Sequence, residues 1–220
     1  TDSCDPRIRR VQNSGMKIAI DGPAASGKTT LARGLAESLG FLFVPTGAMY
    51  RAAALARLRG LELESAELNV YRGGRIHLQQ EDVTDRLSSP ELDKMSSRVA
   101  VDPQVRAHLV ARQRAIAETT DVVMEGRDIG TVVLPDAEVK FYLWAEPGER
   151  ALRRQREQGG TQEEVLAAIM QRDERDTTRA ASPLRPAGDA HVLDNTGLTP
   201  EQSLAAALRV VEEHRARETG

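Results

Sequence analysis

A chain of 220 residues is long enough for one α/β domain with a core of its own. Its net charge of −3 argues against a protein that coats nucleic acid. The single cysteine, Cys4, excludes an intramolecular disulfide and suits a reducing cytoplasm. No apolar run approaches the ~20 residues that a membrane-spanning helix needs, so we expect a cytoplasmic protein with neither a membrane nor a nucleic-acid partner.

Residues 1–15 form a polar stretch in front of Met16. We expect this stretch to be a mobile extension outside the fold. The folded domain would then span residues 16–220.

Apolar runs and helical periodicities alternate along most of this domain. The predicted buried strands are 17–21, 41–44, 121–125, 139–144 and 191–193. The predicted helices are 27–39, 46–59, 103–119, 147–158, 162–176 and 200–217. Strands that alternate with helices indicate a parallel sheet with helices on both faces, and ligands then bind at the carboxyl ends of the strands.

A segment over about 62–98, called the insert below, breaks this alternation. Its residues 88–91, Ser-Ser-Pro-Glu, are typical of a helix start, with a hydroxyl cap and a proline in the first turn. Before them, Gly73 and Gly74 predict a hairpin turn in a small antiparallel sheet. The expected short strands of this sheet are 68–72, 75–79 and 82–84.

One stretch matches the phosphate-loop motif G-x-x-x-x-G-K-[ST], called the P-loop below. Its residues are Gly22, Pro23, Ala24, Ala25, Ser26, Gly27, Lys28 and Thr29. It lies between a predicted strand and a predicted helix, as the motif requires, although a glycine-rich turn without a ligand is the alternative. We therefore predict an ATP site that includes the adjacent Thr30, with Lys28 on the β- and γ-phosphates and Thr29 on Mg²⁺.

A P-loop does not by itself distinguish a GTPase, a motor ATPase and a small-molecule kinase. The three asparagines, Asn13, Asn69 and Asn195, do not precede a lysine, so the Asn-Lys-x-Asp run of a guanine-reading GTPase is absent. A motor usually needs a longer chain or a ring. A short chain with an insert and an arginine-rich segment favours a small kinase.

Four stretches together are specific for one kinase family. They are residues 20–29, the T-G-A-M-Y-R of 46–51, the E-G-R-D-I-G-T-V-V of 125–133 and the R-D-E-R-D-T-T-R of 172–179. From Met16 to its end the chain resembles the bacterial cytidylate kinases, which transfer the γ-phosphoryl group of ATP to CMP and dCMP. The resemblance implies a P-loop parallel sheet with a small antiparallel insert, an arginine-rich lid, ATP with Mg²⁺, and a monomer.

The residues themselves support an acceptor site at the strand ends. Thr46, Tyr50 and Arg51 follow the second strand and could hold a phosphate and a ring, but an ordinary helix start is the alternative. Arg127 and Asp128 follow a buried strand, where a structural ion pair is the alternative. The resemblance implies that Ser97, Arg106, Asp128 and Arg179 contact cytosine, and that Arg51, Arg127, Arg172 and Asp176 contact phosphate or ribose.

Two arginine clusters complete the prediction. The spacing of the first cluster predicts one helix face that carries Arg172, Arg175, Asp176 and Arg179. Asp173 and Glu174 fall off that face. The alternative is a solvated charged surface. The second cluster precedes Gly159 and Gly160 and consists of Arg150, Arg153, Arg154 and Arg156. We predict that it belongs to a lid over about 150–162. The alternative is an exposed basic helix. The predicted catalytic cations are Lys28, Arg127, Arg153, Arg154, Arg172 and Arg175.

The chain departs from the family pattern at Pro45, where an acidic residue usually precedes the hydroxyl, and at Thr46, where serine is commoner. Pro45 removes a carboxylate and a backbone donor. The rival hypotheses are a P-loop kinase for UMP, shikimate or pantothenate, and a non-catalytic nucleotide-binding regulator. The insert and the G-R-D-I-G-T-V-V stretch argue against shikimate, and intact Lys28 and Thr29 argue against the regulator.

Overall fold

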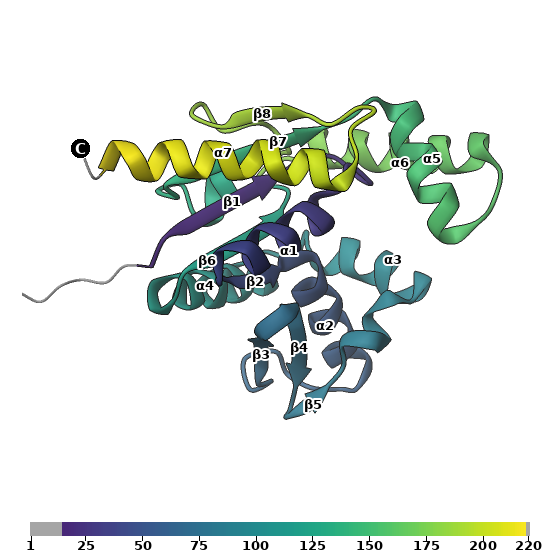
Figure 1. The fold of residues 1–220 in the computed structure, drawn as a ribbon. Coiled ribbons are helices and arrows are strands. Elements are labelled where there is room, and N and C mark those ends of the chain that lie inside the picture. Colours follow the sequence, from purple (N-terminus) through teal and green to yellow (C-terminus); the bar gives the residue numbers. More distant parts are fainter. Residues whose placement is uncertain (1–14, 219–220) are drawn as a thin grey trace, which may run out of the picture.

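A computed structural model describes residues 15–218 (Figure 1). The predicted extension over 1–15 therefore lies outside the described residues, apart from Gly15. The strands are β1 (Lys17–Asp21), β2 (Leu42–Pro45), β3 (Leu68–Tyr71), β4 (Arg75–Leu78), β5 (Glu81–Asp82), β6 (Val122–Gly126), β7 (Val139–Trp144) and β8 (His191–Asp194). The α-helices are α1 (Lys28–Leu39), α2 (Thr46–Leu58), α3 (Pro90–Val99), α4 (Pro103–Thr119), α5 (Pro147–Gln158), α6 (Gln162–Thr178) and α7 (Pro200–Glu218).

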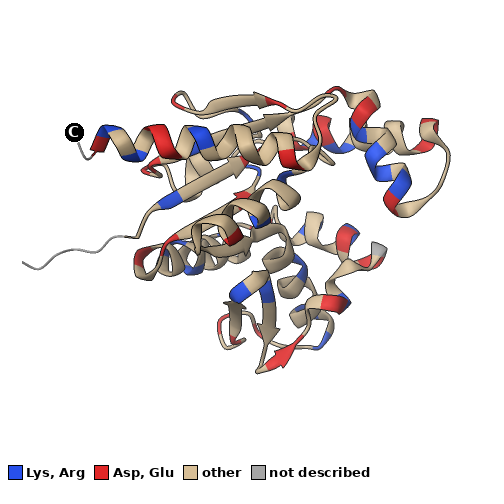
Figure 2. Ribbon diagram, in the orientation of Figure 1, with Lys and Arg blue, Asp and Glu red and all other residues tan. Residues whose placement is uncertain are grey.

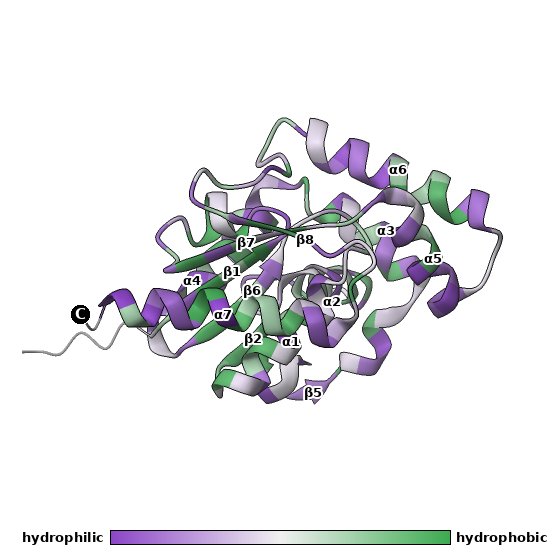
Figure 3. Ribbon diagram, turned by 45° about the horizontal axis from the view of Figure 1, so that its top comes forward, coloured by the Kyte–Doolittle hydropathy of each residue, from purple (hydrophilic) through white to green (hydrophobic). Residues whose placement is uncertain are grey.

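The main sheet has the order β2-β6-β1-β7-β8, and all of its paired strands are parallel. Side chains of a strand alternate between its faces. In β1, Ile18 and Ile20 pack on the side of α1 and α7, whereas Ala19 packs on the side of α2 and α4. A sheet covered on both faces needs apolar residues throughout, and Figure 3 shows β1, β6 and β7 as largely hydrophobic (green) between the helices. The predicted α/β fold is confirmed.

The antiparallel sheet of the insert is also present, in the order β3-β4-β5. A short 3₁₀ turn (Arg72–Gly74) joins β3 to β4, and Gly73 and Gly74 both have a positive φ, near 75°. The third strand ends earlier than predicted, because the Thr84 hydroxyl donates to the Asp82 carboxylate at 2.6 Å and turns the chain into the 3₁₀ helix Thr84–Ser88. The predicted helix start is confirmed: the Ser89 hydroxyl accepts the amide of Leu92 at 3.2 Å and caps α3.

Helices α5 and α6 form a hairpin that projects from one end of the main sheet (Figure 1). Gly159 and Gly160 connect them with φ of 75° and 90°, a conformation that favours glycine. Thr161 then begins α6 with a capping box in which the Thr161 hydroxyl and the Glu164 amide pair at 3.3 Å. The helix continues to Thr178, two residues beyond its predicted end, and the hydroxyls of Thr177 and Thr178 both donate to carbonyls one turn back.

The carboxyl edge of the main sheet brings distant segments together. Directly after β1 comes the P-loop, after β2 comes α2, and after β6 come Arg127 and Asp128. The hairpin of α5 and α6 follows β7 at the same edge. Over residues 15–218, no helix has both the length and the apolar character needed to cross a membrane.

Candidate active site

The P-loop has a backbone that only small residues allow. Gly22 has φ +154°, and a Cβ atom there would lie 2.2 Å from the carbonyl oxygen of Leu143 in β7. Gly27 is left-handed, with φ +89°, and forms the N-cap of α1. The chain therefore turns tightly from β1 into a helix N-terminus, where free amides and the helix dipole favour an anion.

Lys28 is the first residue of α1, directly after this turn, and is buried. Its Nζ donates to the Pro23 carbonyl at 2.5 Å and to the Ser26 hydroxyl at 3.3 Å. Burial, followed by the nearby cations Arg127 and Arg172, holds the pKa of Lys28 well below its usual range. Phosphate oxygens would counter both effects, because a negative charge favours the protonated amine.

Thr29 and Glu125 offer the oxygen ligands that Mg²⁺ prefers. The Thr29 hydroxyl donates to the carboxylate of Glu125, at the end of β6, at 3.2 Å. No group of three His, Cys, Asp or Glu within residues 15–218 has metal-ligand geometry, so phosphate oxygens would have to supply further ligands. The residues fit a Mg²⁺–nucleotide rather than a metal bound by protein alone. Thr30 is exposed in the same helical turn.

Asp21 connects the P-loop to the segment after β6. Its two carboxylate oxygens accept hydrogen bonds from the backbone amides of Ile129 and Gly130, at 2.7 and 2.8 Å. Burial raises the pKa of Asp21 to about 6, against the opposing effect of these two hydrogen bonds. The carboxylate thus fixes the backbone immediately after Asp128.

A cluster of arginines lies beside Lys28. The Arg127 Nε pairs with Asp176 of α6 at 2.7 Å. Burial opposes the charge of Arg127, but Asp176 outweighs it, and the net pKa of Arg127 is raised. Burial and the neighbouring Arg127 lower the pKa of Arg172. Two guanidinium groups and an ammonium group in one partly buried region are suited to phosphoryl oxygens.

A second part of the cluster surrounds Asp93 of α3. Its carboxylate lies 3.2 Å from Arg51 of α2, 3.7 Å from Arg154 of α5 and 4.0 Å from Arg172 of α6. Basic residues (blue) are visible on each of these three helices in Figure 2. Arg51 also has a buried Nε without a hydrogen-bond partner among the described residues, so its guanidinium has a donor left for a ligand.

A third group of side chains surrounds Asp128, which is buried. Arg106 of α4 pairs with the Asp128 carboxylate and donates to the Ser182 hydroxyl at 2.9 Å and the Tyr50 hydroxyl at 3.4 Å. The Arg179 Nη2 lies 3.7 Å from Asp128 and has no hydrogen-bond partner in the described part of the chain. A carboxylate, two guanidinium groups, a phenol and a hydroxyl can together recognise the polar edge of a base.

Two other residues that were predicted to contact CMP form hydrogen bonds within the protein through their hydroxyl groups. The Thr46 hydroxyl donates to the carbonyl of Glu125 at 2.7 Å and holds the start of α2 against β6. The Ser97 hydroxyl donates to the carbonyl of Asp93, one turn earlier in α3, at 3.2 Å. Pro45 is the buried last residue of β2, so this departure from the family pattern lies at the carboxyl edge.

The hairpin of α5 and α6 contacts the P-loop through Arg150, a member of the predicted lid cluster, and through Asp173, for which no ligand contact was predicted. Arg150 is buried, pairs with Asp173 at 2.5 Å and donates to the Ala24 carbonyl at 2.9 Å. The Asp173 carboxylate accepts the Ala24 amide at 3.0 Å. Asp173 does lie off the face of Arg172 and Asp176, as expected, but it faces the P-loop rather than solvent.

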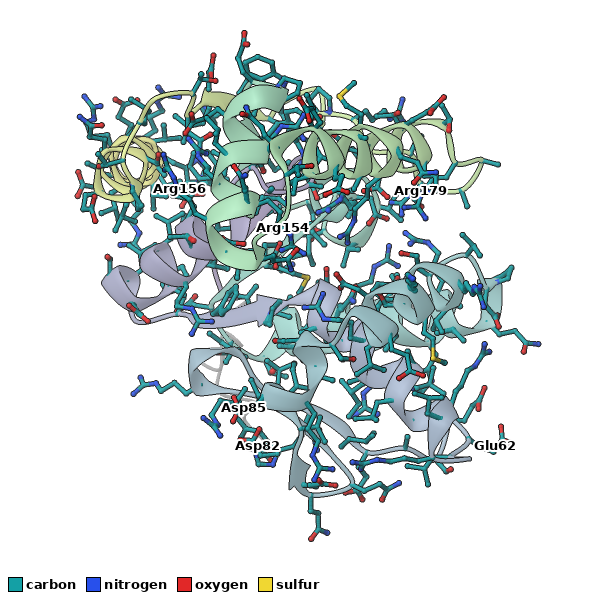
Figure 4. All side chains as sticks on the ribbon, turned by 90° about the vertical axis from the view of Figure 1, so that its right-hand side faces the viewer. Glu62, Asp82, Asp85, Arg154, Arg156 and Arg179 are labelled. Carbon is teal, nitrogen blue, oxygen red and sulfur yellow. The ribbon has the colours of Figure 1, made fainter. Side chains whose placement is uncertain are left out.

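The predicted lid arginines lie in different places. Arg153 donates to the Asn195 carbonyl at 2.8 Å, and Asn195 in turn donates to the Ser26 carbonyl, so Arg153 lies next to the P-loop. Figure 4 shows Arg154 on α5 and Arg179 at the end of α6, apart from Asp82 in the insert. Arg156 is exposed. Arg175 is also exposed and has no side-chain hydrogen bond or ion pair within residues 15–218.

Comparison with known proteins identifies the family. A family model described as cytidylate kinase matches residues 18–213. The chain belongs to the cytidylate kinase family. One relative, the cytidylate kinase of Pelotomaculum thermopropionicum, is 48% identical over 210 residues, covering 86% of this chain and 93% of the relative. The cytidylate kinase of Thermotoga maritima is 43% identical over 215 residues, covering 90% and 98%.

Solved structures share the fold at low identity. An uncharacterized protein from Eubacterium ventriosum has a TM-score of 0.55 with 13% identity, covering 90% of this chain and 98% of that one. A putative kinase from Chloroflexus aurantiacus has a TM-score of 0.51 with 14% identity, covering 93% and 97%. At such identity these likenesses show the fold alone, whereas the family rests on the sequence relatives.

Proposed function

We propose that this protein transfers the γ-phosphoryl group of ATP to CMP and dCMP. The observation that carries the proposal is the pairing of two half-sites at one sheet edge: a P-loop around buried Lys28, and a cation cluster that leads to buried Asp128. Membership of the cytidylate kinase family supports the same activity.

The donor half would bind ATP through the P-loop amides and Lys28. Thr29 and Glu125 would hold Mg²⁺ against the β- and γ-phosphates, where the ion supplies charge neutralisation. In the reaction, a phosphate oxygen of CMP bonds to the γ-phosphorus, the bond to the β-phosphate oxygen breaks, and its electron pair leaves with ADP. The attacking oxygen is already ionised, so no general base is required.

The acceptor half would hold the CMP phosphate in line with that attack. Arg127 and Arg172 lie beside Lys28. Arg51, which approaches the same Asp93 as Arg172, has an Nε donor without a partner among the described residues. Fixed guanidinium groups bind phosphate oxygens in pairs and neutralise the charge that spreads over the transferred group. Catalysis in this scheme is positioning and electrostatic stabilisation, to which Arg153 and Arg154 would contribute when α5 and α6 close over the phosphates.

Asp128 would give the preference for cytosine. Its carboxylate can accept a hydrogen bond from the exocyclic amine of cytosine, while Arg106 and Arg179 present donors to the ring acceptors. Uracil has a carbonyl in place of the amine, so two acceptors would face each other. An unsatisfied buried polar group discriminates strongly between such analogues.

An ADP-release assay with MgATP and a panel of acceptors tests the function. CMP and dCMP are expected to be the best acceptors, ahead of UMP, AMP, shikimate and pantothenate. A different best acceptor would contradict the proposal, and nucleotide binding without turnover on any acceptor would favour a regulator.

The finer properties follow from the family resemblance. We infer that the enzyme works as a monomer in the cytoplasm, with small-molecule substrates only. Both half-sites are built from one chain, so a second copy is not required for the chemistry. Light scattering at micromolar concentration, with and without CMP and ATP, should give the mass of one chain.

A further inference from the structure

Asp93 is the carboxylate around which three arginines from different helices converge. Its Oδ1 lies 3.2 Å from the Arg51 Nη1, and its Oδ2 lies 3.7 Å from Arg154 and 4.0 Å from Arg172. The residue is half-buried, with 33% of its side chain exposed. The resemblance to cytidylate kinases did not include this position among the site residues.

The arginines around Asp93 are neutralised only in part. Only the contact with Arg51 has hydrogen-bond length, because the other two exceed 3.5 Å. The Arg51 Nε remains buried without a partner among the described residues. One carboxylate has two oxygens and a single charge, whereas a phosphate monoester has three terminal oxygens and up to two charges. The arrangement therefore suits a larger and more highly charged anion than the carboxylate present.

The position of Asp93 on α3 agrees with the proposed path of CMP. Ser97, expected at the base, follows Asp93 by one helical turn, and the Ser97 hydroxyl bonds to the Asp93 carbonyl. One turn corresponds to about 5 Å along the helix axis. Asp93 therefore lies at the phosphate end of the nucleotide when Ser97 lies at the base end.

We infer that Asp93 holds the phosphate-binding arginines in the free enzyme and that the CMP phosphate displaces it. This inference rests on the proposed function. The carboxylate reduces the mutual repulsion of Arg51, Arg154 and Arg172, and it competes with the substrate for the same donors. Asp93 is thus a positioning residue that weakens the binding of the phosphate group and leaves the binding of the nucleoside unchanged.

Calorimetric binding of CMP and of cytidine to Asp93→Asn tests this inference. The variant keeps the size of the side chain and removes its charge, with Asp93→Ser as a second variant should the first fail to fold. CMP binding should become about three- to tenfold tighter, since partly exposed ion pairs of this kind are modest. Cytidine binding should change by less than about twofold, because cytidine lacks the phosphate group.

Glu91→Gln is the matched control. Glu91 is exposed two residues earlier in α3 and has no ion pair within the described residues, so the control removes the same charge from the same helix. It should leave both affinities unchanged. Unchanged or weaker CMP binding in Asp93→Asn, or an equal shift for cytidine, would overturn the inference. A wild-type protein that does not bind CMP would instead overturn the proposed function, and the inference with it.

Discussion

The proposed donor and acceptor halves of the site are built in different ways. Most of the donor half is one continuous segment, residues 22–29, which runs from the end of β1 into the first turn of α1, and β6 adds Glu125. The acceptor half takes single side chains from α2, α3, α4, α6 and the segment after β6, and ion pairs hold them together. The donor half is therefore largely a local structure that a short stretch of sequence specifies. The acceptor half exists only once the fold has assembled.

This difference predicts different responses to mutation. A substitution in the donor half removes one group from the P-loop and directly weakens its contact with the ATP phosphates. Acceptor-side residues share carboxylates, as Arg51 and Arg172 share Asp93, so their substitutions should be non-additive.

The largest effect is expected at Lys28. Lys28→Met keeps most of the buried volume but removes the only ammonium group in the P-loop, and kcat should fall about 10²–10³-fold or more. Circular dichroism should show an unchanged fold. The control is Lys17→Met at the opposite end of β1, where the ammonium group pairs with the exposed Asp136. A kcat within tenfold of wild type for Lys28→Met would contradict the role of Lys28 in the donor half.

Asp173 tests the link between the hairpin of α5 and α6 and the P-loop. Asp173→Asn leaves the buried Arg150 without its charged partner, which should lower the free energy of unfolding by about 3 kcal/mol and raise the KM for ATP. Glu174→Gln, an exposed neighbour in α6, should change neither quantity. Urea denaturation and steady-state kinetics provide the measurements. Equal stability of the two variants would show that the link is not needed.

Asp21 should make stability depend on pH. Its pKa rises from 3.8 to about 6 on folding, so the folded protein binds the proton more tightly than the unfolded chain does. The free energy of unfolding should therefore fall by up to about 3 kcal/mol as the pH rises from about 4 to 6, and stay level above about 7. Urea denaturation at several pH values, with Asp21→Asn as the reference, isolates this contribution. A difference between the two proteins that is constant with pH would contradict it.

The smallest effect distinguishes two arginines of α6 that the sequence pattern groups together. Arg172 is near Lys28 and Asp93, whereas Arg175 is exposed. Arg172→Ala should lower kcat/KM for CMP about tenfold or more, the loss of a charged contact to phosphate. Arg175→Ala should lower it less than about twofold. Similar losses in both variants would support the original grouping of Arg175 with the catalytic cations.

Much of the fold could be predicted because its signals are local. Apolar runs identified the strands of the main sheet, and Gly73-Gly74 and Ser89-Pro90 identified the hairpin turn and the start of α3. The strand ends were predicted less accurately, because a hydrogen bond such as that between Thr84 and Asp82 can end a strand without any change in the apolar pattern of the sequence.

The site residues that were missed are those whose partners lie far away in the sequence. Asp173 contacts Ala24 across 149 positions, and Arg106 reaches Ser182 across 76. Ser182 has no motif around it, and its positive φ of 54° is visible only in the structure. Asp21 and Glu125 lay next to recognised motifs at the carboxyl ends of strands, so their position was the one available signal.

In the proposed active site, a P-loop works together with an acceptor half around Asp128 that recognises cytosine. The most direct measurement is the ratio of kcat/KM for UMP to that for CMP in wild type and Asp128→Ala. The ratio should be much higher in the variant, because CMP loses its hydrogen-bond acceptor while UMP loses a repulsive contact. An equal ratio in the two proteins would contradict this role of Asp128.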